Sequence, residues 1–362
     1  MILHNHFLKE AIKLSCFTMG GLLVLFLTMR FASYLGDAAS GQVAPEYVTK
    51  IVLLKTLVSL KDLIPISLFL GTFAAMTRLQ QTSEWISMRA AGISVASMIN
   101  KLLLVSGIAA IFVSLITFQF SPRAELTLIE LKEDGQNNAN IAGIKPEIFK
   151  RLSGRTKVFY AQATSEDGEY LEKAFVHDDS QQGDAVMSAE RAYISTDLVN
   201  RKLAVFENGT SYVGKPGTLN YVVTDFSKYN NKIKEKEKSD YTSYPSFVPT
   251  SGLMNGNRHY TTELHWRLAP VFTTVLTPIL ATLIAMRIQG NKWYLSMIIG
   301  LSGFFVYQNC LGIGRSLLKN DDIPLALGLW PIHLLFTLCL FCLYTHLQKG
   351  YVIRTRKRKR AQ

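Results

Sequence analysis

Several basic residues of this chain lie inside or directly beside its longest apolar runs, where charged side chains are uncommon. Lys55 and Lys61 precede the apolar run at residues 63–75, and Arg30 follows an earlier run. Guanidinium and ammonium groups in a partly dry environment bind phosphate oxygens through charge-assisted hydrogen bonds. This chemistry predicts a cavity that receives an anionic headgroup. The predicted anion-binding residues are Arg30, Lys55, Lys61, Arg315 and Lys319.

A structural role for these charges is also open. Long basic side chains extend along a membrane span to reach lipid headgroups. Four acidic residues lie near them in sequence and could neutralise several of them: Asp37, Asp62, Asp321 and Asp322. The apolar run after Lys55 and Lys61 is shorter than the roughly 20 residues needed to cross hydrocarbon, so the span must extend back through both lysines. Charges inside a span usually face a cavity or a partner, which favours a binding role for these two residues.

The other residue types that carry chemistry form no recognisable catalytic pattern. The sequence has no phosphate-binding loop, nucleophile elbow, paired catalytic carboxylates or metal-spaced His and Cys cluster in a credible context. Its four cysteines lie in or beside apolar runs, where a thiol behaves as a small apolar group. We therefore expect a chain that is not an enzyme and that holds no metal or cofactor of its own.

The elements that position these residues are mainly membrane helices. Hydrophobic residues make up 48% of the 362 residues and are concentrated towards the two ends. Six runs are expected to cross a membrane, centred on residues 14–35, 63–75, 93–120, 273–286, 294–313 and 325–347. The expected domains are helices 1–3 in residues 1–121, a β domain in 122–261, helices 4–6 in 262–348 and a basic tail in 349–362.

The polar middle of the chain predicts an all-β domain, a sandwich or jelly-roll-like fold, because short β-branched and aromatic runs alternate with turn signals. Asn208-Gly209 predicts a hairpin turn between two of these runs. Several apolar side chains on the predicted strands could line a groove, although filling the core is the simpler role. The groove candidates are Val158, Tyr160, Phe175, Tyr221 and Val223.

Residues 78–92 lie between two apolar runs and are too polar to enter lipid. They predict a helix across the membrane face, capped by Thr82 or Ser83 and ended by Gly92 in the left-handed conformation. Glu84 and Arg89 complement the positive and negative ends of its dipole. An ordinary connector between spans explains this pattern too. The predicted docking side chains are Glu84, Trp85, Met88 and Arg89.

Short basic loops set the expected orientation. The N-terminus, residues 78–101, residues 287–292 and the tail are all net basic, which places them in the cytoplasm and the β domain on the other side. The formal net charge of +12 is explained by this asymmetry, and no nucleic-acid motif competes with it.

With this architecture, residues 65–94 and the segment ELHWRL at 263–268 resemble the LptF/LptG family of lipopolysaccharide export permeases, and the second segment resembles LptF more. The spacing of Ser83, Glu84, Met88, Ala90 and Gly92 carries most of the resemblance. The family's β domain is a periplasmic jelly roll, and its segment corresponding to 78–92 is a coupling helix. Trp85 and Arg89 are bulkier or more charged than is usual there.

The resemblance implies a multi-pass subunit in the inner membrane of a Gram-negative bacterium. It would pair with an LptG-like permease, be driven by ATP hydrolysis in an LptB-like cytoplasmic ATPase dimer, and extract lipopolysaccharide. It would pass the lipid to LptC-like and LptA-like periplasmic proteins.

Two other functions are open. One is a membrane-anchored periplasmic adaptor that transports nothing, and the other is a mechanically coupled ATP-driven permease that carries no lipid. The adaptor needs neither charges inside a span nor a capped cytoplasmic helix, so both features favour transport.

Overall fold

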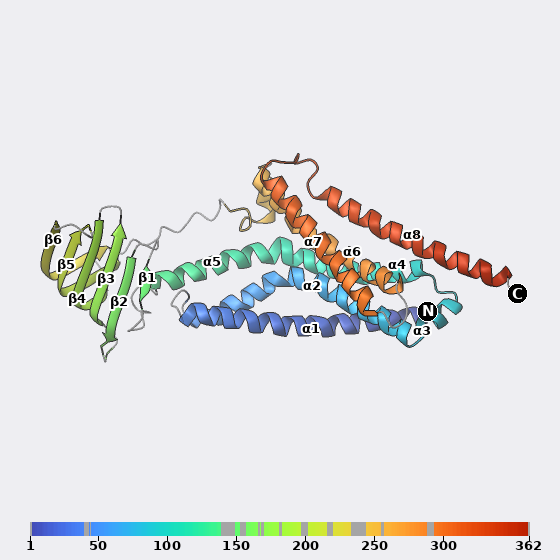
Figure 1. Cartoon of the computed structure of the whole chain (residues 1–362), viewed down its shortest axis with the longest axis horizontal. Helices are drawn as coiled ribbons and strands as arrows, with labels where there is room; N and C mark the ends of the chain where they lie inside the picture. Colours follow the sequence, from blue (N-terminus) through green and yellow to red (C-terminus); the bar gives the residue numbers. More distant parts are fainter. Residues whose placement is uncertain are drawn as a thin grey trace. The chain divides into compact units, whose positions relative to one another are not determined.

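The computed structural model describes most of the chain, as helices and strands in Figure 1. The described residues are 2–39, 43, 45–138, 149–152, 157–165, 167, 170–180, 183–196, 202–215, 220–232, 244–254, 257–287 and 293–360. Of the basic loop expected at 287–292, only Arg287 is among these residues.

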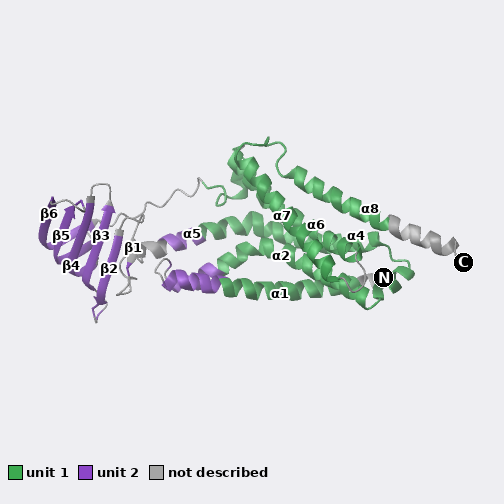
Figure 2. Ribbon diagram, viewed as in Figure 1, with its two compact units in different colours: residues 1–29, 53–127, 241–362 green, residues 30–52, 128–240 purple. Residues whose placement is uncertain are grey.

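Two compact units divide the chain (Figure 2). Unit 1 comprises Met1–Met29, Leu53–Thr127 and Tyr241–Gln362, and it contains most of the helices. Unit 2 comprises Arg30–Val52 and Leu128–Asp240, and it contains the β-strands. Residues 244–254, which the sequence analysis expects within the β domain, belong to the helical unit.

Along the chain, the helices form the two expected groups, one before the strands and one after them. They are α1 (Ile2–Ala39), α2 (Val48–Gln81), α3 (Glu84–Ala90), α4 (Val95–Leu115), α5 (Ser121–Asn138), α6 (Arg258–Arg287), α7 (Trp293–Lys319) and α8 (Trp330–Arg360). By length and composition, five stretches of the described residues could cross a membrane: His6–Ala39, Val95–Glu133, Arg258–Arg287, Trp293–Lys319 and Trp330–Gln348. These helices and the inserted antiparallel sheet confirm the predicted class, a helical membrane protein with a β insertion. The charged helix α2 is not among the five.

Helix α6 organises unit 1, because it packs against α4, α7 and α8. Pro270 and Pro278 lie inside this helix, and each removes one backbone donor. Thr274 and Thr282 donate their hydroxyl hydrogens to the carbonyl oxygens of these two prolines, at 2.7 and 2.9 Å. Hydroxyls on buried faces of α6 therefore find partners within the helix itself.

The predicted end of the third span at Ser121-Pro122 is wrong. Helix α4 continues through a π-helix, η2 (Ile116–Phe120), directly into α5, so the chain stays helical to Asn138. The backbone N–H of Ser121 donates to the carbonyl of Ile116, five residues earlier. Proline is tolerated in the first turn of a helix, and the wider π turn shifts the bonding pattern just before Pro122.

The strands form one antiparallel sheet of unit 2, in which each strand pairs with its neighbours in the chain. They are β1 (Lys150–Leu152), β2 (Lys157–Thr164), β3 (Leu171–Ser180), β4 (Gly183–Thr196), β5 (Lys202–Gly214) and β6 (Tyr221–Lys232). One face carries a hydrophobic cluster that includes Phe159, Ala174, Met187, Ala189 and Phe206.

The predicted hairpin at Asn208-Gly209 is also wrong, because both residues lie inside the continuous strand β5. Asn208 adopts a left-handed backbone conformation with φ of 50°. The alternation of side chains between the two faces of the sheet shifts there by one residue. The same shift occurs on β4, where Ala189 and Ala192 are both buried although they are three residues apart. A Cβ atom on Gly209 would lie 2.2 Å from the backbone carbonyl oxygen of Ser188, so the strand needs glycine there. The Asn208-Gly209 dipeptide therefore marks a one-residue shift in which side chains face the hydrophobic cluster, and not a turn.

Candidate functional site

The segment between α2 and α4 forms a short helix, α3, at one end of unit 1. Residues 78–81, expected at its start, complete α2 instead, and Gly92 ends the segment with φ of 86°, as predicted. Ser83 precedes the helix but makes no capping bond with its side chain, which corrects its predicted role. The Thr82 hydroxyl donates back to the carbonyl of Arg78, so it is not a cap for α3 either.

Trp85 and Met88 were predicted to dock a partner, but they face the interior of the chain. They are 2% and 1% exposed and belong to one hydrophobic cluster with Phe7 and Met76. The Arg89 guanidinium lies over the Trp85 ring, 5.7 Å from its centroid. A seven-residue helix is marginal on its own, so these buried side chains stabilise α3 and cannot reach a partner.

Other side chains of α3 remain accessible, among them Ile86 and Glu84. Ile86 is 67% exposed, and Glu84 is partly exposed with Oε2 2.9 Å from His6 Nε2. Ile86 is not in the predicted docking set, which included its buried neighbour Trp85. The exposed surface of this segment thus combines one carboxylate with one large aliphatic side chain.

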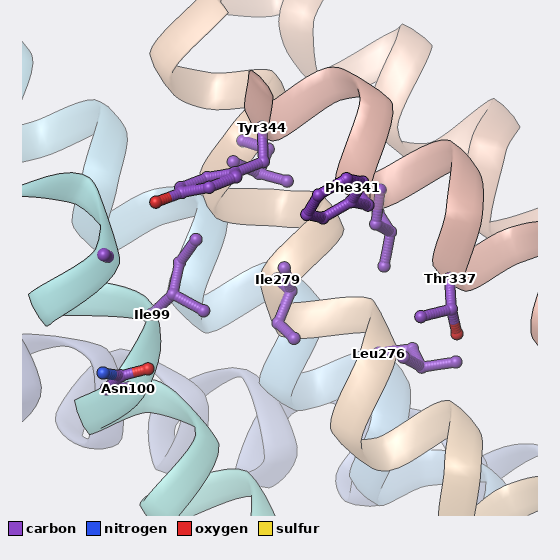
Figure 3. A pocket seen from close by; sticks show the side chains of 10 residues that line it. Ile99, Asn100, Leu276, Ile279, Thr337, Phe341 and Tyr344 are labelled. Atoms are coloured by element: carbon purple, nitrogen blue, oxygen red, sulfur yellow. The ribbon is translucent and has the colours of Figure 1, made fainter. Parts of the chain in front are cut away.

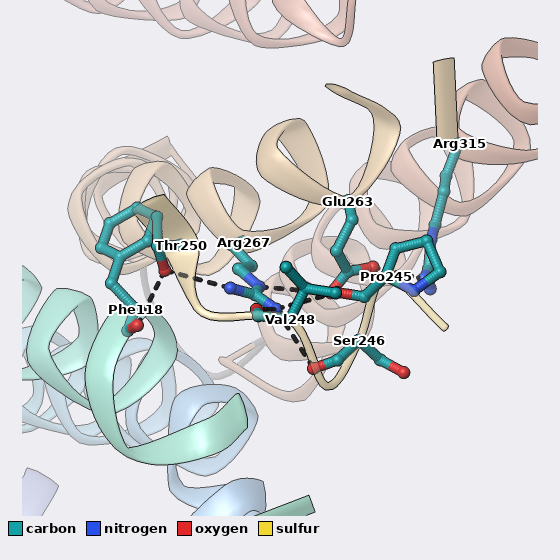
Figure 4. A network of polar contacts seen from close by, with 8 residues as sticks. All are labelled: Phe118, Pro245, Ser246, Val248, Thr250, Glu263, Arg267 and Arg315. Carbon is teal, nitrogen blue, oxygen red and sulfur yellow. Dashed lines mark hydrogen bonds and ion pairs between the residues drawn. The ribbon is translucent and has the colours of Figure 1, made fainter. Parts of the chain in front are cut away.

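The second candidate region is a buried polar network at the start of α6 (Figure 4). Arg267 is 3% exposed, and all three nitrogens of its guanidinium donate hydrogen bonds. The acceptors are the carbonyl oxygens of Pro245, Ser246 and Val248, the Thr250 hydroxyl and the Glu263 carboxylate, at 2.9–3.4 Å. Thr250 in turn donates to the carbonyl of Phe118 in the π-helix, at 2.7 Å. The network fixes the strap at residues 244–254 against the helices.

Arg315, a predicted anion-binding residue, belongs to the same network. Its guanidinium lies 2.9 Å from Glu263 Oε2 and 4.5 Å from the centroid of the Trp266 ring. Its side chain is nevertheless 39% exposed. Two arginines therefore share the Glu263 carboxylate, and only Arg315 is open to a ligand.

The lysines of α2 are connected to this network through Glu125, which sequence reasoning missed. Glu125 interacts electrostatically with Lys55 and Lys61 on one side and with Glu263 and Arg267 on the other. Asp62 also interacts with both lysines. With every group ionised, four cations face three carboxylates, which leaves one net positive charge. Only the folded chain brings Glu125 to this position, so no sequence signal marked it.

The remaining two predicted anion-binding residues lie elsewhere. Lys319 is exposed in the last turn of α7, close in sequence to the ion pair between Arg258 and Asp321. Arg30 is partly buried and belongs to unit 2, whereas the other four residues belong to unit 1. Lys55 and Lys61 thus interact with Asp62 and Glu125, whereas Arg315 pairs with Glu263.

The five groove candidates all lie on one face of the sheet, opposite the hydrophobic cluster. Tyr160 pairs with Phe175, and Val158 lies in a row across the strands with His177, Val186, Tyr212 and Val223. Residues two apart on a strand share a face, which adds Tyr221. Val223, Tyr221 and Tyr212 are 55%, 46% and 45% exposed. This face is therefore apolar and partly open, and Val186 and Tyr212 extend the predicted set.

Unit 1 also has an apolar groove between α4, α6 and α8, with a volume of about 310 Å³ (Figure 3). It is lined by Ala96, Ile99, Asn100, Leu276, Ile279, Leu283, Thr337, Leu340, Phe341 and Tyr344. Asn100, Thr337 and Tyr344 are its polar members, and none of the predicted site residues lies in it.

Taken together, these features define a multi-pass membrane protein with an inserted β-sheet, an exposed short helix between two long ones, and a charged network within its helices. The chain belongs to the family described as lipopolysaccharide export system permease LptF/LptG, whose model matches residues 5–346. Curated relatives include the lipopolysaccharide export system permease protein LptF of Escherichia coli (strain K12) and that of Shigella flexneri. Each is 21% identical over 343 residues, which cover 93% of this chain and 92% of the relative.

Proposed function

We propose that this chain is the LptF-like permease subunit of an ATP-driven transporter in the inner membrane. It extracts lipopolysaccharide and passes it through its β region, on the periplasmic side, to LptC-like and LptA-like proteins. An LptG-like permease is its partner in the membrane, and an LptB-like ATPase dimer hydrolyses ATP. The observation that carries this proposal is the family match over residues 5–346.

The exposed surface of α3 supports the coupling step. An amphipathic helix docks in a groove through a few anchors. Ile86 offers an apolar anchor, Glu84 offers a charge, and the buried Trp85 and Met88 hold the helix in place for that contact. This assignment replaces direct docking by Trp85 and Met88.

Purification of the complex from its native membrane tests the coupling step. Glu84→Lys and Ile86→Asp should each reduce the co-purifying ATPase about tenfold, which corresponds to a loss of about 1.4 kcal/mol in binding. Lys101→Glu is the matched control, because Lys101 is exposed on α4 and lies outside the docking surface. Wild-type amounts of ATPase with both variants would contradict the docking role.

The charged network supports recognition of a phosphorylated lipid. Lys55, Lys61 and Arg315 contribute to a net positive charge within the helical unit, and Arg315 is accessible. Each charge-assisted bond to phosphate contributes about 1.5–3 kcal/mol. Lipopolysaccharide that co-purifies with the chain should fall about a hundredfold or more in the double variant Lys61→Gln, Arg315→Gln, which removes two such bonds. The control is Lys101→Gln.

An unchanged amount of bound lipid would assign these charges to internal pairing and membrane anchoring only. That result would place the lipid site elsewhere in the chain, whereas a wild-type complex that co-purifies with no lipid would favour the mechanically coupled permease. Cross-linkers placed at Val158 and Val223 would then decide whether the open face of the sheet touches lipid at all. Labelling of lipid at either position supports passage through the β region, and labelling of neither contradicts it.

A further inference from the structure

Helix α1 contacts the rest of unit 1 along one narrow stripe. Phe7, Ala11 and Ser15 are buried at intervals of four residues, whereas Phe17 and Val24 are 79% and 64% exposed. Residues four apart lie on the same face of a helix. We call this stripe the α1 seam (Phe7, Ala11, Ser15 and Thr18), and Leu14 packs beside it against the same hydrophobic cluster as Phe7.

The middle of the α1 seam contacts the backbone of α2. The Thr18 hydroxyl donates to the carbonyl of Ser67 at 3.1 Å. A Cβ atom on Gly71 would lie 2.3 Å from the backbone nitrogen of Ser15, so glycine at this position permits the close approach. Small and hydroxyl residues are the usual means by which membrane helices pack closely. Helices α1 and α2 therefore touch along this part of the seam.

The beginning of the seam connects α1 to α3 and to the last turn of α2. Phe7 is 1% exposed and shares a hydrophobic cluster with Trp85 and Met88 of α3. Two polar contacts flank this cluster: His6 Nε2 lies 2.9 Å from Glu84 Oε2, and Arg78 donates to Glu10 Oε2 at 2.9 Å. His6 and Glu10 are one turn apart on α1. We call these two contacts the clasp.

We propose that the clasp makes α3 and the start of α1 move as one body, so that Glu10 and Arg78 are positioning residues that transmit docking of the ATPase to α1. This inference rests on the proposed function, because it presumes that α3 receives the ATPase. It adds a route: a displacement of α3 reaches α1 directly through Phe7 and His6. The last turn of α2, which a two-residue turn joins to α3, also transmits it to α1 through the pair of Arg78 and Glu10. Glu84 then contributes both to docking and, through His6, to the α1 contact.

Charge reversal tests this route without touching the docking surface. Glu10→Arg and Arg78→Glu each place two like charges at the site of a native pair that lies 2.9 Å apart, and the double variant restores an opposite pair. We measure lipopolysaccharide released per ATP hydrolysed by the assembled complex in vesicles. Each single variant should lower that ratio about fivefold, the lower end of typical coupling effects, because Arg78 is partly exposed. The double variant should recover at least half of the wild-type ratio. Lys9→Glu is the control, because Lys9 is exposed beside the seam.

Each outcome decides the matter. A wild-type ratio in both single variants, or a double variant as impaired as the single ones, overturns the clasp. Should the single variants fail to assemble, Glu10→Gln and Arg78→Gln replace them, and a wild-type ratio in both overturns the proposal. If the wild-type complex itself releases no lipid on ATP hydrolysis, the proposed function fails instead. Coupling in the wild type with equal coupling in every variant therefore removes only the clasp.

Discussion

Replacing Arg267 with methionine should be one of the most damaging single substitutions in the helical unit. The side chain is 3% exposed, and its guanidinium donates to three carbonyl groups of the strap at residues 244–254. It also donates to Thr250 and Glu263. Methionine fills much of the same volume but leaves all these acceptors without their donor.

The expected loss in the free energy of unfolding depends on which partners of Arg267 stay paired after the substitution. Breaking a buried ion pair by removing one partner costs about 3–5 kcal/mol. Glu263 keeps its contact with Arg315, so we place the loss for Arg267→Met near the lower end, about 3 kcal/mol. Arg258→Met is the matched control. Arg258 donates to two carbonyl groups and pairs with Asp321, but water reaches this site, and its loss should cost about 1 kcal/mol.

The assay is the free energy of unfolding of the full chain in mixed micelles, measured by titration with a denaturing detergent. Limited proteolysis within residues 244–254 provides a local readout, because a released strap is cut faster than a fixed one. Equal losses for Arg267→Met and Arg258→Met, with no change in cleavage, would refute this account of the network.

Three further predictions follow from single contacts. The Tyr193 hydroxyl donates to Glu207 and holds the pKa of that carboxyl below its ordinary value, so this stabilisation is present above the unfolded-state pKa and is lost as pH falls through the folded one. Tyr193→Phe should raise the pKa in a carbon-13 titration of labelled glutamate; an unchanged pKa contradicts this. Gly71→Ala should destabilise the chain by about 1–3 kcal/mol through overpacking, whereas Gly20→Ala, with open space around it, should not. Asn208→Gly should be tolerated, but Asn208→Val should cost about 1–2 kcal/mol, because its φ is positive; equal stabilities would refute the strain.

The helices were predictable because membrane spans depend on a local property, the length of an apolar run. The exception is instructive. Pro122 normally marks the end of a helix, but the π-helix before it continues the chain into α5. The sequence contains the proline, whereas the altered bonding pattern depends on packing around the buried Ile116 and Thr117. A local rule could not predict that adjustment.

The sheet and the charged network depend on contacts between distant residues. The alternation of buried and exposed side chains shifts by one residue at Asn208 on β5 and also on the neighbouring strand β4. The sequence of one strand alone does not show this shared shift, so Asn208-Gly209 looked like a turn. Glu125 comes within electrostatic range of the lysines of α2 and of Arg267 in α6 only after folding. The same holds for α3, where Trp85 and Ile86 are adjacent in sequence but are 2% and 67% exposed.

The two arginines that share Glu263 have different roles, and their surroundings show why. A buried ion pair is weak evidence for stability, because desolvation offsets much of its attraction. Arg267 is closed to a ligand, since it is 3% exposed and each of its three nitrogens already donates to a group of the chain. Arg315 is 39% exposed and stacks on Trp266, so a phosphate can replace Glu263 as its partner while Arg267 keeps that carboxylate paired. Lipid binding at Arg315 then requires no unpaired buried charge, which makes it the residue of this network suited to exchange partners.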